Sequence, residues 1–237
     1  MPIMTRRAGP VARIDPDLAR LGAALADPSR VAMLDALLDG KPHPIGSLAR
    51  RAGITAATAS GHLRRLVDDR LVTVTRAGRE HRVALASPEV AQLLETMAAL
   101  APPSPAFTAA AGARARELRA ASTCYDHLAG VLGVRITAAL VDRGWLVVAG
   151  ESYTATPRLT EWIAAHGTAV ADSRRPLVRA CIDWSERLPH LAGRLGAAVC
   201  DLALAERWVA RVRDSRALRV TDRGRRAFAA ELGVALR

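Results

Sequence analysis

The stretch from residue 52 to residue 85 is rich in side chains that can bind nucleic acid. Its first part has the pattern of a helix, with Leu63 and Leu66 on one face and Thr55 at a position that can cap the first turn. The polar side carries hydroxyl, imidazole and guanidinium groups, from Thr55, Thr58, Ser60, His62, Arg64 and Arg65. Arginine can form two hydrogen bonds with guanine, and hydroxyl groups can bond bases or phosphate. These six residues are candidate DNA contacts; a helix that is only solvated on its polar side, with His62 as packing, is the alternative.

A two-stranded ribbon is predicted directly after this helix. Valine alternates with threonine over residues 72–75, which is strand periodicity, and the chain turns at residues 76–79 before it returns along residues 82–85. The ribbon carries three arginines, Arg76, Arg79 and Arg82. Such a ribbon can reach phosphate groups or a minor groove. We therefore expect phosphate contacts from some of the three arginines and ordinary surface positions for the others.

Two further helices are predicted ahead of this unit. The sequence Asp-Pro-Ser-Arg at residues 27–30 opens the first and puts proline near its first turn, and Gly40 ends it. Residues 44–53 form the second, which Gly53 closes. Helix, helix, tight turn, helix and ribbon is the order of a winged helix-turn-helix, whose recognition helix enters the major groove of DNA.

Two segments carry a more specific pattern, ALADPSRVAMLDALLDG and IGSLARRAGITAATASGHLRRLVDDRLV. In their LADPSR helix entry, their Ser-x-His-Leu core and the Leu-Val pair before the ribbon, residues 16–100 resemble the ArsR-type family of bacterial repressors. The resemblance implies a homodimer on a double-stranded DNA operator, with residues 16–26 and 88–100 as dimer helices. The usual metal sites of that family do not carry over, since residues 45–49 lack a Cys-x-Cys pair and residues 90–100 lack histidine.

Length and composition indicate a cytoplasmic protein of two domains. The chain has 237 residues, half of them hydrophobic, which is enough for two cores. Its net charge of +11 suits a polyanionic partner, although a basic surface alone is not specific. No run approaches the length of a membrane span, the N-terminus lacks a secretory apolar region, and the 3 cysteines do not pair evenly. We therefore expect reduced thiols and no membrane partner.

Prolines mark the boundary between the two domains. Three of them within residues 102–105 cannot continue a helix and predict a semi-stiff connector. We expect an N-terminal tail over 1–15, a winged-helix DNA-binding domain over 16–100, a proline-rich linker over 101–106, and a C-terminal domain over 107–237 that senses a signal or fixes assembly.

The C-terminal domain contains an internal repeat. The sequence HLAGVLG at residues 127–133 recurs as HLAGRLG at residues 190–196, at an offset of 63 positions, and Cys-x-Asp precedes both copies. Each copy continues as helix, tryptophan, ribbon and helix, which predicts two winged-helix-like halves about a pseudo-twofold axis. The predicted fold class is therefore mainly α with small β wings (α+β).

The repeat places cysteine and histidine where they could bind a soft metal ion such as zinc. Cys124 and His127 are three positions apart, so on a helix they would share a face, and Cys181 and His190 could supply a matching pair. A mixed Cys/His site would result if the two motifs meet. The interpretation we prefer is a packing motif, whose small residues let helices cross closely while each histidine bonds a neighbouring group.

The same packing could leave a cleft for an organic ligand between the two repeats. Four aromatic residues are candidates to line it, Tyr125, Trp145, Trp184 and Trp208. Each of the tryptophans is more simply explained as a core residue. The choice between a metal ion and an organic ligand as effector therefore stays open.

Together these patterns predict a sequence-specific DNA-binding transcriptional regulator, a repressor whose operator affinity is controlled by an effector bound at the C-terminal domain. An architectural DNA-binding protein without an effector is the main alternative. An enzyme that uses Cys124 beside His127 as a nucleophile pair is a further one. The chain has no Gly-x-Ser-x-Gly, Walker, dinucleotide-binding or HExxH motif, so we expect no enzyme.

Overall fold

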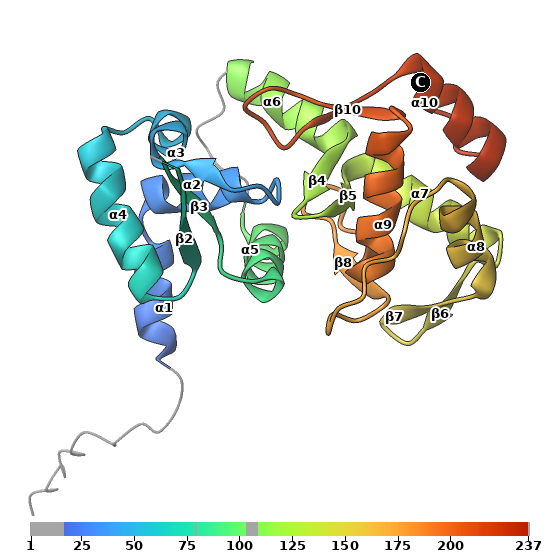
Figure 1. Cartoon of the computed structure of the whole chain (residues 1–237), viewed down its shortest axis with the longest axis horizontal. Coiled ribbons are helices and arrows are strands. Elements are labelled where there is room, and N and C mark those ends of the chain that lie inside the picture. Colours follow the sequence, from blue (N-terminus) through green and yellow to red (C-terminus); the bar gives the residue numbers. More distant parts are fainter. Residues whose placement is uncertain (1–16, 79, 103–108, 237) are drawn as a thin grey trace, which may run out of the picture.

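The computed structural model of the chain describes residues 17–78, 80–102 and 109–236. The elements up to α5 lie at one end of the long axis, and those from α6 onward lie at the other (Figure 1). The expected tail, most of the expected linker and Arg79 lie outside the described residues. No helix in the described ranges is both long and apolar enough to cross a membrane.

The N-terminal half has the winged helix-turn-helix order that the sequence predicts. Its elements are α1 (Leu18–Leu25), α2 (Pro28–Leu37), β1 (His43–Pro44), α3 (Ile45–Ala52), α4 (Ala56–Asp68), β2 (Val72–Ala77), β3 (Glu80–Leu85) and α5 (Pro88–Leu100). The three strands form an antiparallel sheet in the order β1-β3-β2. Leu34, Leu48, Leu66 and Val83 are fully buried in one core, so the helices and the wing form a single packed unit.

Local chemistry explains where the helices of this half begin and end. The Asp27 carboxylate accepts hydrogen bonds from the backbone of Ser29 and Arg30 and so caps α2. Gly53 has a φ of +68°, a left-handed conformation that ends α3 and produces the tight turn before α4. The Thr55 hydroxyl then accepts from the backbone N–H of Thr58, which confirms it as the cap of α4.

The C-terminal half passes twice through the same series of hairpin, helix, hairpin and helix. After α6 (Ala109–Ala120), the first series is β4 (Ser122–Cys124), β5 (His127–Ala129), α7 (Gly130–Asp142), β6 (Leu146–Ala149), β7 (Ser152–Ala155) and α8 (Pro157–Ala165). The second is β8 (Arg179–Ile182), β9 (Pro189–Ala192), α9 (Gly193–Ala205), β10 (Val209–Arg211), β11 (Leu218–Val220) and α10 (Asp222–Ala227), which a π-helical turn at Phe228–Leu232 extends. The predicted repeat therefore exists as a repeated order of elements; its description as winged-helix-like stays an interpretation.

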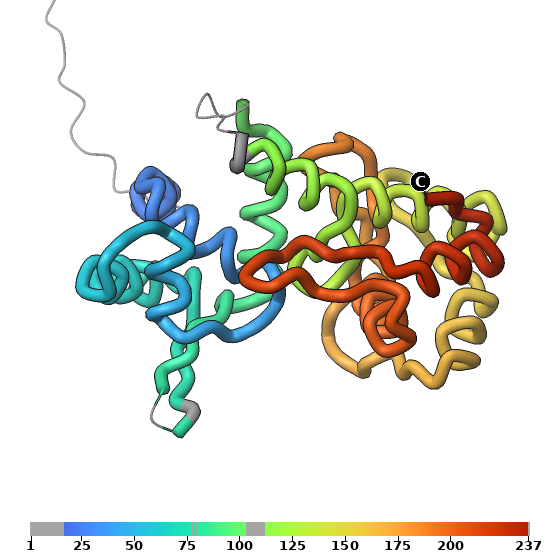
Figure 2. The backbone as a smooth tube through the Cα atoms, turned by 90° about the horizontal axis from the view of Figure 1, so that it is seen from above, coloured from blue at the N-terminus to red at the C-terminus, as the bar shows by residue number. Residues whose placement is uncertain are grey.

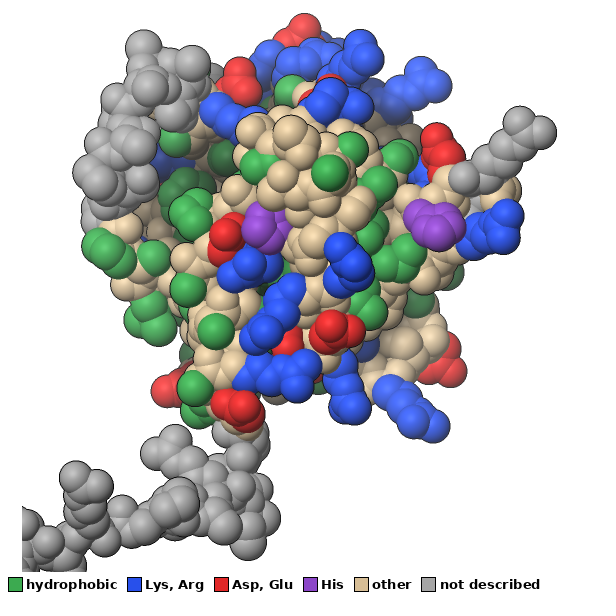
Figure 3. Space-filling model, turned by 90° about the vertical axis from the view of Figure 1, so that its left-hand side faces the viewer, with side chains coloured by type: hydrophobic (Ala, Val, Ile, Leu, Met, Phe, Trp, Pro, Cys, Tyr) green, Lys and Arg blue, Asp and Glu red, His purple; other side chains and the backbone are tan. Residues whose placement is uncertain are grey.

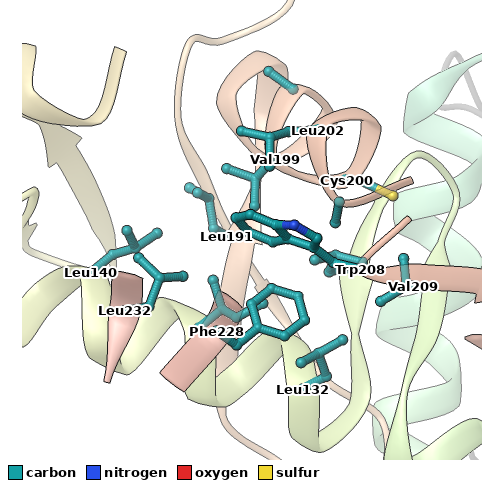
Figure 4. Packing of buried hydrophobic residues seen from close by; sticks show 14 of the residues in the cluster. Leu132, Leu140, Leu191, Val199, Cys200, Leu202, Trp208, Val209, Phe228 and Leu232 are labelled. Atoms are coloured by element: carbon teal, nitrogen blue, oxygen red, sulfur yellow. The ribbon is translucent and has the colours of Figure 1, made fainter. Parts of the chain in front are cut away.

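The two copies of the repeat share one hydrophobic core, and the first helix of each copy packs against the first hairpin of the other. Trp208 is buried near its centre and meets the Phe228 ring edge-on, at a centroid distance of 5.2 Å (Figure 4). Helix α7 packs against β9 of the other series, and α9 packs against β5. A Cβ atom at Gly133 would lie 2.4 Å from the Leu128 carbonyl oxygen, and one at Gly196 would lie 2.5 Å from that of Leu191. Glycine in the HLAGxLG motif is therefore what lets each helix cross its own hairpin so closely.

The hairpin β10–β11 reaches from the C-terminal half to the N-terminal half (Figures 1 and 2). Arg216, in the loop between these strands, is buried there beside Glu95 of α5. The turn between β4 and β5 makes a second junction, because the backbone N–H of Tyr125 donates to the Leu38 carbonyl at 2.7 Å. Tyr125 also packs against the core of the N-terminal half. The two halves are therefore connected by buried polar contacts as well as by the chain.

Candidate nucleic-acid interface and metal cluster

The recognition helix α4 presents an exposed polar face, but several of its side chains bond within the helix. The hydroxyls of Thr55 and Thr58 lie 2.9 Å apart, and Ser60 donates to the Ala56 carbonyl at 2.9 Å. All three residues are exposed, so each hydroxyl has a further hydrogen-bonding position open to solvent. Figure 3 looks onto this end of the molecule, where Lys and Arg side chains form an uneven band with a few acidic ones between them.

His62 has a structural position rather than an outward one. Its Nδ1 lies 3.3 Å from Arg30 Nη1, and its Nε2 lies 3.7 Å from an oxygen of Asp27. Arg30 also donates to the carbonyls of Ala23 and Ala24. The residues that carry the family resemblance, Asp27, Arg30 and His62, therefore form one network that fastens α4 to the start of α2. These contacts favour the packing alternative for His62, and a contact of His62 with DNA stays a prediction.

The two arginines of α4 differ in what they contact. Arg65 pairs with Asp69 at 2.6 Å, and the same carboxylate holds Arg20 of α1 at 2.5 Å. Arg64 is exposed, and we find no ion-pair partner for it among the described residues. It lines a cleft between α3, α4 and the wing, together with Ser60 and His81. Of the side chains on α4, Arg64 is thus the one most available to a base edge or a phosphate.

The wing arginines that the structure describes have different surroundings. Arg76 is exposed, and its Nε donates to the Gly78 carbonyl at the tip at 3.2 Å. Arg82 is half-buried and pairs with Glu80 at 3.2 Å. Arg79 is outside the described residues. Arg76 is therefore the best-placed phosphate contact among the described positions of the wing.

The four cysteine and histidine residues of the repeat meet in a single buried cluster. One ligating atom from each of Cys124, His127, Cys181 and His190 lies within 4.8 Å of the others. Their residues are between 0 and 6% exposed. The expectation that Cys124 and His127 share a helix face is wrong, because Cys124 is in β4 and His127 is in β5, directly opposite across the hairpin. Cys181 and His190 oppose each other in the same way between β8 and β9.

Each histidine of this cluster has an aspartate carboxylate close to its Nδ1 atom. Asp126 lies 3.3 Å from His127 Nδ1, and Asp183 lies 3.4 Å from His190 Nδ1. Burial alone would lower the pKa of His190, but Asp183 and the neighbouring Cys181 outweigh it and raise that pKa to about 9. Histidines that bind metals commonly have such a carboxylate on the nitrogen that faces away from the ion. The Cys-x-Asp sequence that precedes each histidine is the source of this arrangement.

The side chains of Cys124 and Cys181 contact each other. Their sulfur atoms are 3.8 Å apart. Burial raises the pKa of Cys124, whereas the hydrogen bond from Cys124 lowers the pKa of Cys181. The buried environment therefore favours one thiol and one thiolate, and a thiolate is the form in which cysteine binds metal ions.

Two features of the cluster fit a tetrahedral metal ion. Two sulfur ligands at about 2.3 Å from zinc, at the tetrahedral angle, are about 3.8 Å apart, which is the separation observed here. The Nε2 atoms of both His127 and His190 are buried and make no hydrogen bond with any described residue. A buried polar atom without a partner is costly, and a ligand can remove that cost. The residues present therefore fit a metal ion that takes two sulfur and two nitrogen ligands.

The aromatic cleft expected between the repeats does not form from its four predicted residues. Trp208 is buried in the core, and Trp145 packs on Trp162 at a centroid distance of 5.6 Å. Trp184 borders a separate surface hollow with Arg119 and Arg187. Tyr125 packs against the DNA-binding half. The structure therefore corrects this expectation. Burial of a large apolar ring in the core is favourable, which explains the position of Trp208, whereas the other three residues are only partly buried and pack at separate places.

Comparison with known proteins decides the family. A helix-turn-helix domain family matches residues 25–75. The HTH-type transcriptional regulator YdfF of Bacillus subtilis, described as uncharacterized, is 36% identical over 224 residues, which are 93% of this chain and 99% of YdfF. The chain belongs to the ArsR-type winged helix-turn-helix transcriptional regulators. It is a DNA-binding transcriptional regulator, as the sequence predicts.

Two further similarities cover about a third of this regulator. The HTH-type transcriptional regulator CmtR of Mycobacterium tuberculosis is 49% identical over 77 residues, which are 32% of this chain and 64% of CmtR. The NMR structure described as the cadmium metal-sensor CMTR from M. tuberculosis is 40% identical, covers 39% of this chain and 98% of that one, and gives a TM-score of 0.32.

Some contacts of this regulator have little or no local signal in the sequence. Arg30 and Asp27 were part of the family pattern, but their bonds to His62 join residues 32 or more positions apart. Glu95 and Arg216 are buried polar residues that lie 121 positions apart in the chain and form an ion pair at 3.3 Å. A glutamate among the apolar residues of α5 was a visible signal for Glu95. No local signal marks Arg216 among the many arginines of the chain.

Arg64→Ala is expected to lower the affinity for operator DNA by about 5- to 150-fold, the loss of one bidentate arginine contact with a base. The measurement is a fluorescence-anisotropy titration with operator DNA at a fixed salt concentration. Arg158→Ala, at an exposed arginine of α8, is the matched control and should bind as the wild type does. Wild-type affinity of the Arg64→Ala protein would show that the arginine faces solvent in the complex.

Proposed function

We propose that this regulator is a homodimeric repressor whose operator affinity is controlled by a metal ion bound at Cys124, His127, Cys181 and His190. The observation that carries the proposal is the convergence of these four buried ligating groups from both halves of the repeat. Metal binding was the less favoured interpretation of the sequence. The separation of the two sulfur atoms and the unpaired imidazole nitrogens now support it.

The dimer part of the proposal is supported by exposed apolar side chains on α1 and α5. Leu18 is 73% exposed, and Met97 and Leu100 are 43% and 78% exposed. Contact between copies of the chain would remove such surface from water. In a dimer, two copies of α4 can enter successive major grooves of a near-palindromic operator. A regulator that binds chromosomal DNA in this way acts in the cytoplasm.

The donor set indicates which class of metal ion the cluster would take. Two thiolates and two imidazoles favour zinc and softer ions such as cadmium or copper(I) over magnesium or calcium. The ion would be held by residues of β4, β5, β8 and β9, with Asp126 and Asp183 orienting the two imidazoles. If the ion binds better to the arrangement that cannot hold DNA, it lowers operator affinity through linkage.

The test is a titration of reduced, metal-free protein with a fluorescent duplex of its own upstream DNA, first with a chelator and then with added Zn²⁺ or Cd²⁺. We expect selective binding to this duplex over a scrambled one, and an affinity at least about tenfold lower with metal. Selective binding that ignores both ions would refute metal control and direct the search to organic ligands. Binding without sequence preference would instead support the architectural alternative.

A further inference from the structure

We infer that Glu95 and Arg216 are the positioning residues through which the Cys/His cluster acts on the DNA-binding half. The inference rests on the proposed function, because it concerns how metal occupancy reaches α5. Glu95 lies on α5, one of the two expected dimer helices, and Arg216 lies in the loop between β10 and β11. Both residues are almost completely buried at the junction of the two halves.

Arg216 joins three elements by direct contacts. Its Nη1 donates to Glu95 Oε1 at 3.3 Å and to the Thr123 carbonyl at 3.2 Å, and its Nε lies 3.4 Å from Asp35 Oδ1 of α2. The backbone N–H of Thr123 donates back to the Arg216 carbonyl at 2.9 Å. A single guanidinium therefore connects α2 and α5 of the DNA-binding half with strand β4.

Thr123 directly precedes Cys124, a proposed metal ligand. On the other side of Cys124, the N–H of Tyr125 is bonded to Leu38 at the end of α2. The chain at Cys124 is therefore attached to the DNA-binding half on both sides. Any movement of Cys124 must be passed to Arg216, to Leu38, or to both.

Metal binding would require the four ligating atoms of the cluster to move closer together. Ligating atoms around a tetrahedral zinc ion are about 3.3 to 3.8 Å apart. The four atoms here span up to 4.8 Å, so the cluster must contract by as much as about 1 Å to bind an ion. Close-packed interiors pass on displacements of this size instead of absorbing them. The Thr123–Arg216 contacts then carry the contraction to the buried Arg216–Glu95 pair.

The position of the Glu95 carboxylate depends on the position of Arg216. Its Oε1 receives the bond from Arg216, and its Oε2 is buried with no hydrogen-bond partner among the described residues. A buried ion pair loses much of its stabilisation when its geometry is disturbed, because water cannot compensate either charge. A shift of Arg216 therefore favours a different position of Glu95, and with it of α5.

Glu95→Gln tests this inference, because it removes the charge while it keeps the shape and leaves the four cluster residues intact. Because the Glu95 carboxylate also lies close to Cys124, Cys181 and His190, the zinc affinity of the variant is measured first, by competition with a chromophoric chelator, and the operator titration is run at a zinc concentration that saturates the variant. The effect of zinc on operator affinity should fall from about tenfold or more to less than about threefold. By reciprocity, operator DNA should also stop weakening zinc binding in this variant, which checks the loss of coupling by a second measurement. A purely structural role would instead lower the operator affinity of the zinc-free variant, which we expect to match that of the wild type.

Glu89→Gln is the matched control, since Glu89 is an exposed glutamate in the first turn of the same helix. It should respond to zinc as the wild type does. If Glu95→Gln fails to fold, the double variant Glu95→Gln/Arg216→Met removes both charges of the pair and gives the same test. A full zinc response in either folded variant would overturn the inference. A wild-type protein that binds zinc without a change in operator affinity would overturn it together with metal control.

Discussion

The Cys124→Ser protein is expected to bind zinc at least about 100-fold more weakly than the wild type and to hold its operator equally well with and without zinc. A serine hydroxyl is a much poorer zinc ligand than a thiolate, and loss of even a supporting group around a metal costs 10- to 100-fold in affinity. Chelator competition measures the first effect, and anisotropy titration with operator DNA measures the second. This is the largest functional effect that we expect from one substitution.

Cys200→Ala is the control for this prediction. Cys200 is a buried free thiol on α9, but it packs in the hydrophobic core and is not among the four cluster residues. Its removal should leave zinc affinity and the operator response unchanged. A Cys124→Ser protein with wild-type zinc affinity would show that the cluster is only a packing arrangement, the interpretation that the sequence favoured.

Gly196→Ala is expected to destabilise the C-terminal half by about 3 kcal/mol, the upper part of the usual range for overpacking a core. The added Cβ would lie 2.5 Å from the Leu191 carbonyl oxygen and 3.2 Å from the Cβ of His127. The first contact is with backbone, which cannot turn away as a flexible side chain can. Relief of this clash must separate α9 from the cluster, so zinc binding should weaken too. Thermal unfolding followed by circular dichroism, with and without zinc, measures both effects.

Gly22→Ala is the matched control for this change. Gly22 lies in α1, and a Cβ at this position would have no heavy atom within 4 Å. Alanine also favours a helix over glycine by about 1 kcal/mol, so the variant should be as stable as the wild type or slightly more stable. A Gly196→Ala protein that unfolds with the wild type and binds zinc normally would mean that α9 can move aside without cost.

The DNA-binding half was predictable because its signals are local. Asp27 and Thr55 cap helices within three residues of their own positions, and Gly53 ends α3 through its own backbone conformation. Valine and threonine alternate in β2, and of its two valines Val72 is buried in the core while Val74 is 39% exposed. Short-range bonds and hydrophobic periodicity carry this information, so the order of elements could be read without a structure.

The C-terminal half was predictable only at the level of its repeat. The pattern identified the four cluster residues, but it placed Cys124 and His127 on a helix, where the structure has a hairpin. A spacing of three positions fits both a helical turn and the two ends of a tight hairpin. Packing of α7 against β9 and of α9 against β5 selects the hairpin. The sequence likewise showed the three tryptophans and the tyrosine of the expected cleft, but it did not show that they pack at separate places in the folded chain.

By itself, the sequence determined the winged helix-turn-helix unit, the two repeats and the types of side chain available for DNA and metal. Only the tertiary structure decided that Cys124, His127, Cys181 and His190 meet, that His62 is bound to Arg30 and that Arg216 reaches Glu95. These contacts join residues that are 3 to 121 positions apart in the chain. Most of them depend on how whole elements pack, and that packing is set by the burial of apolar surface throughout each core, which no local pattern contains.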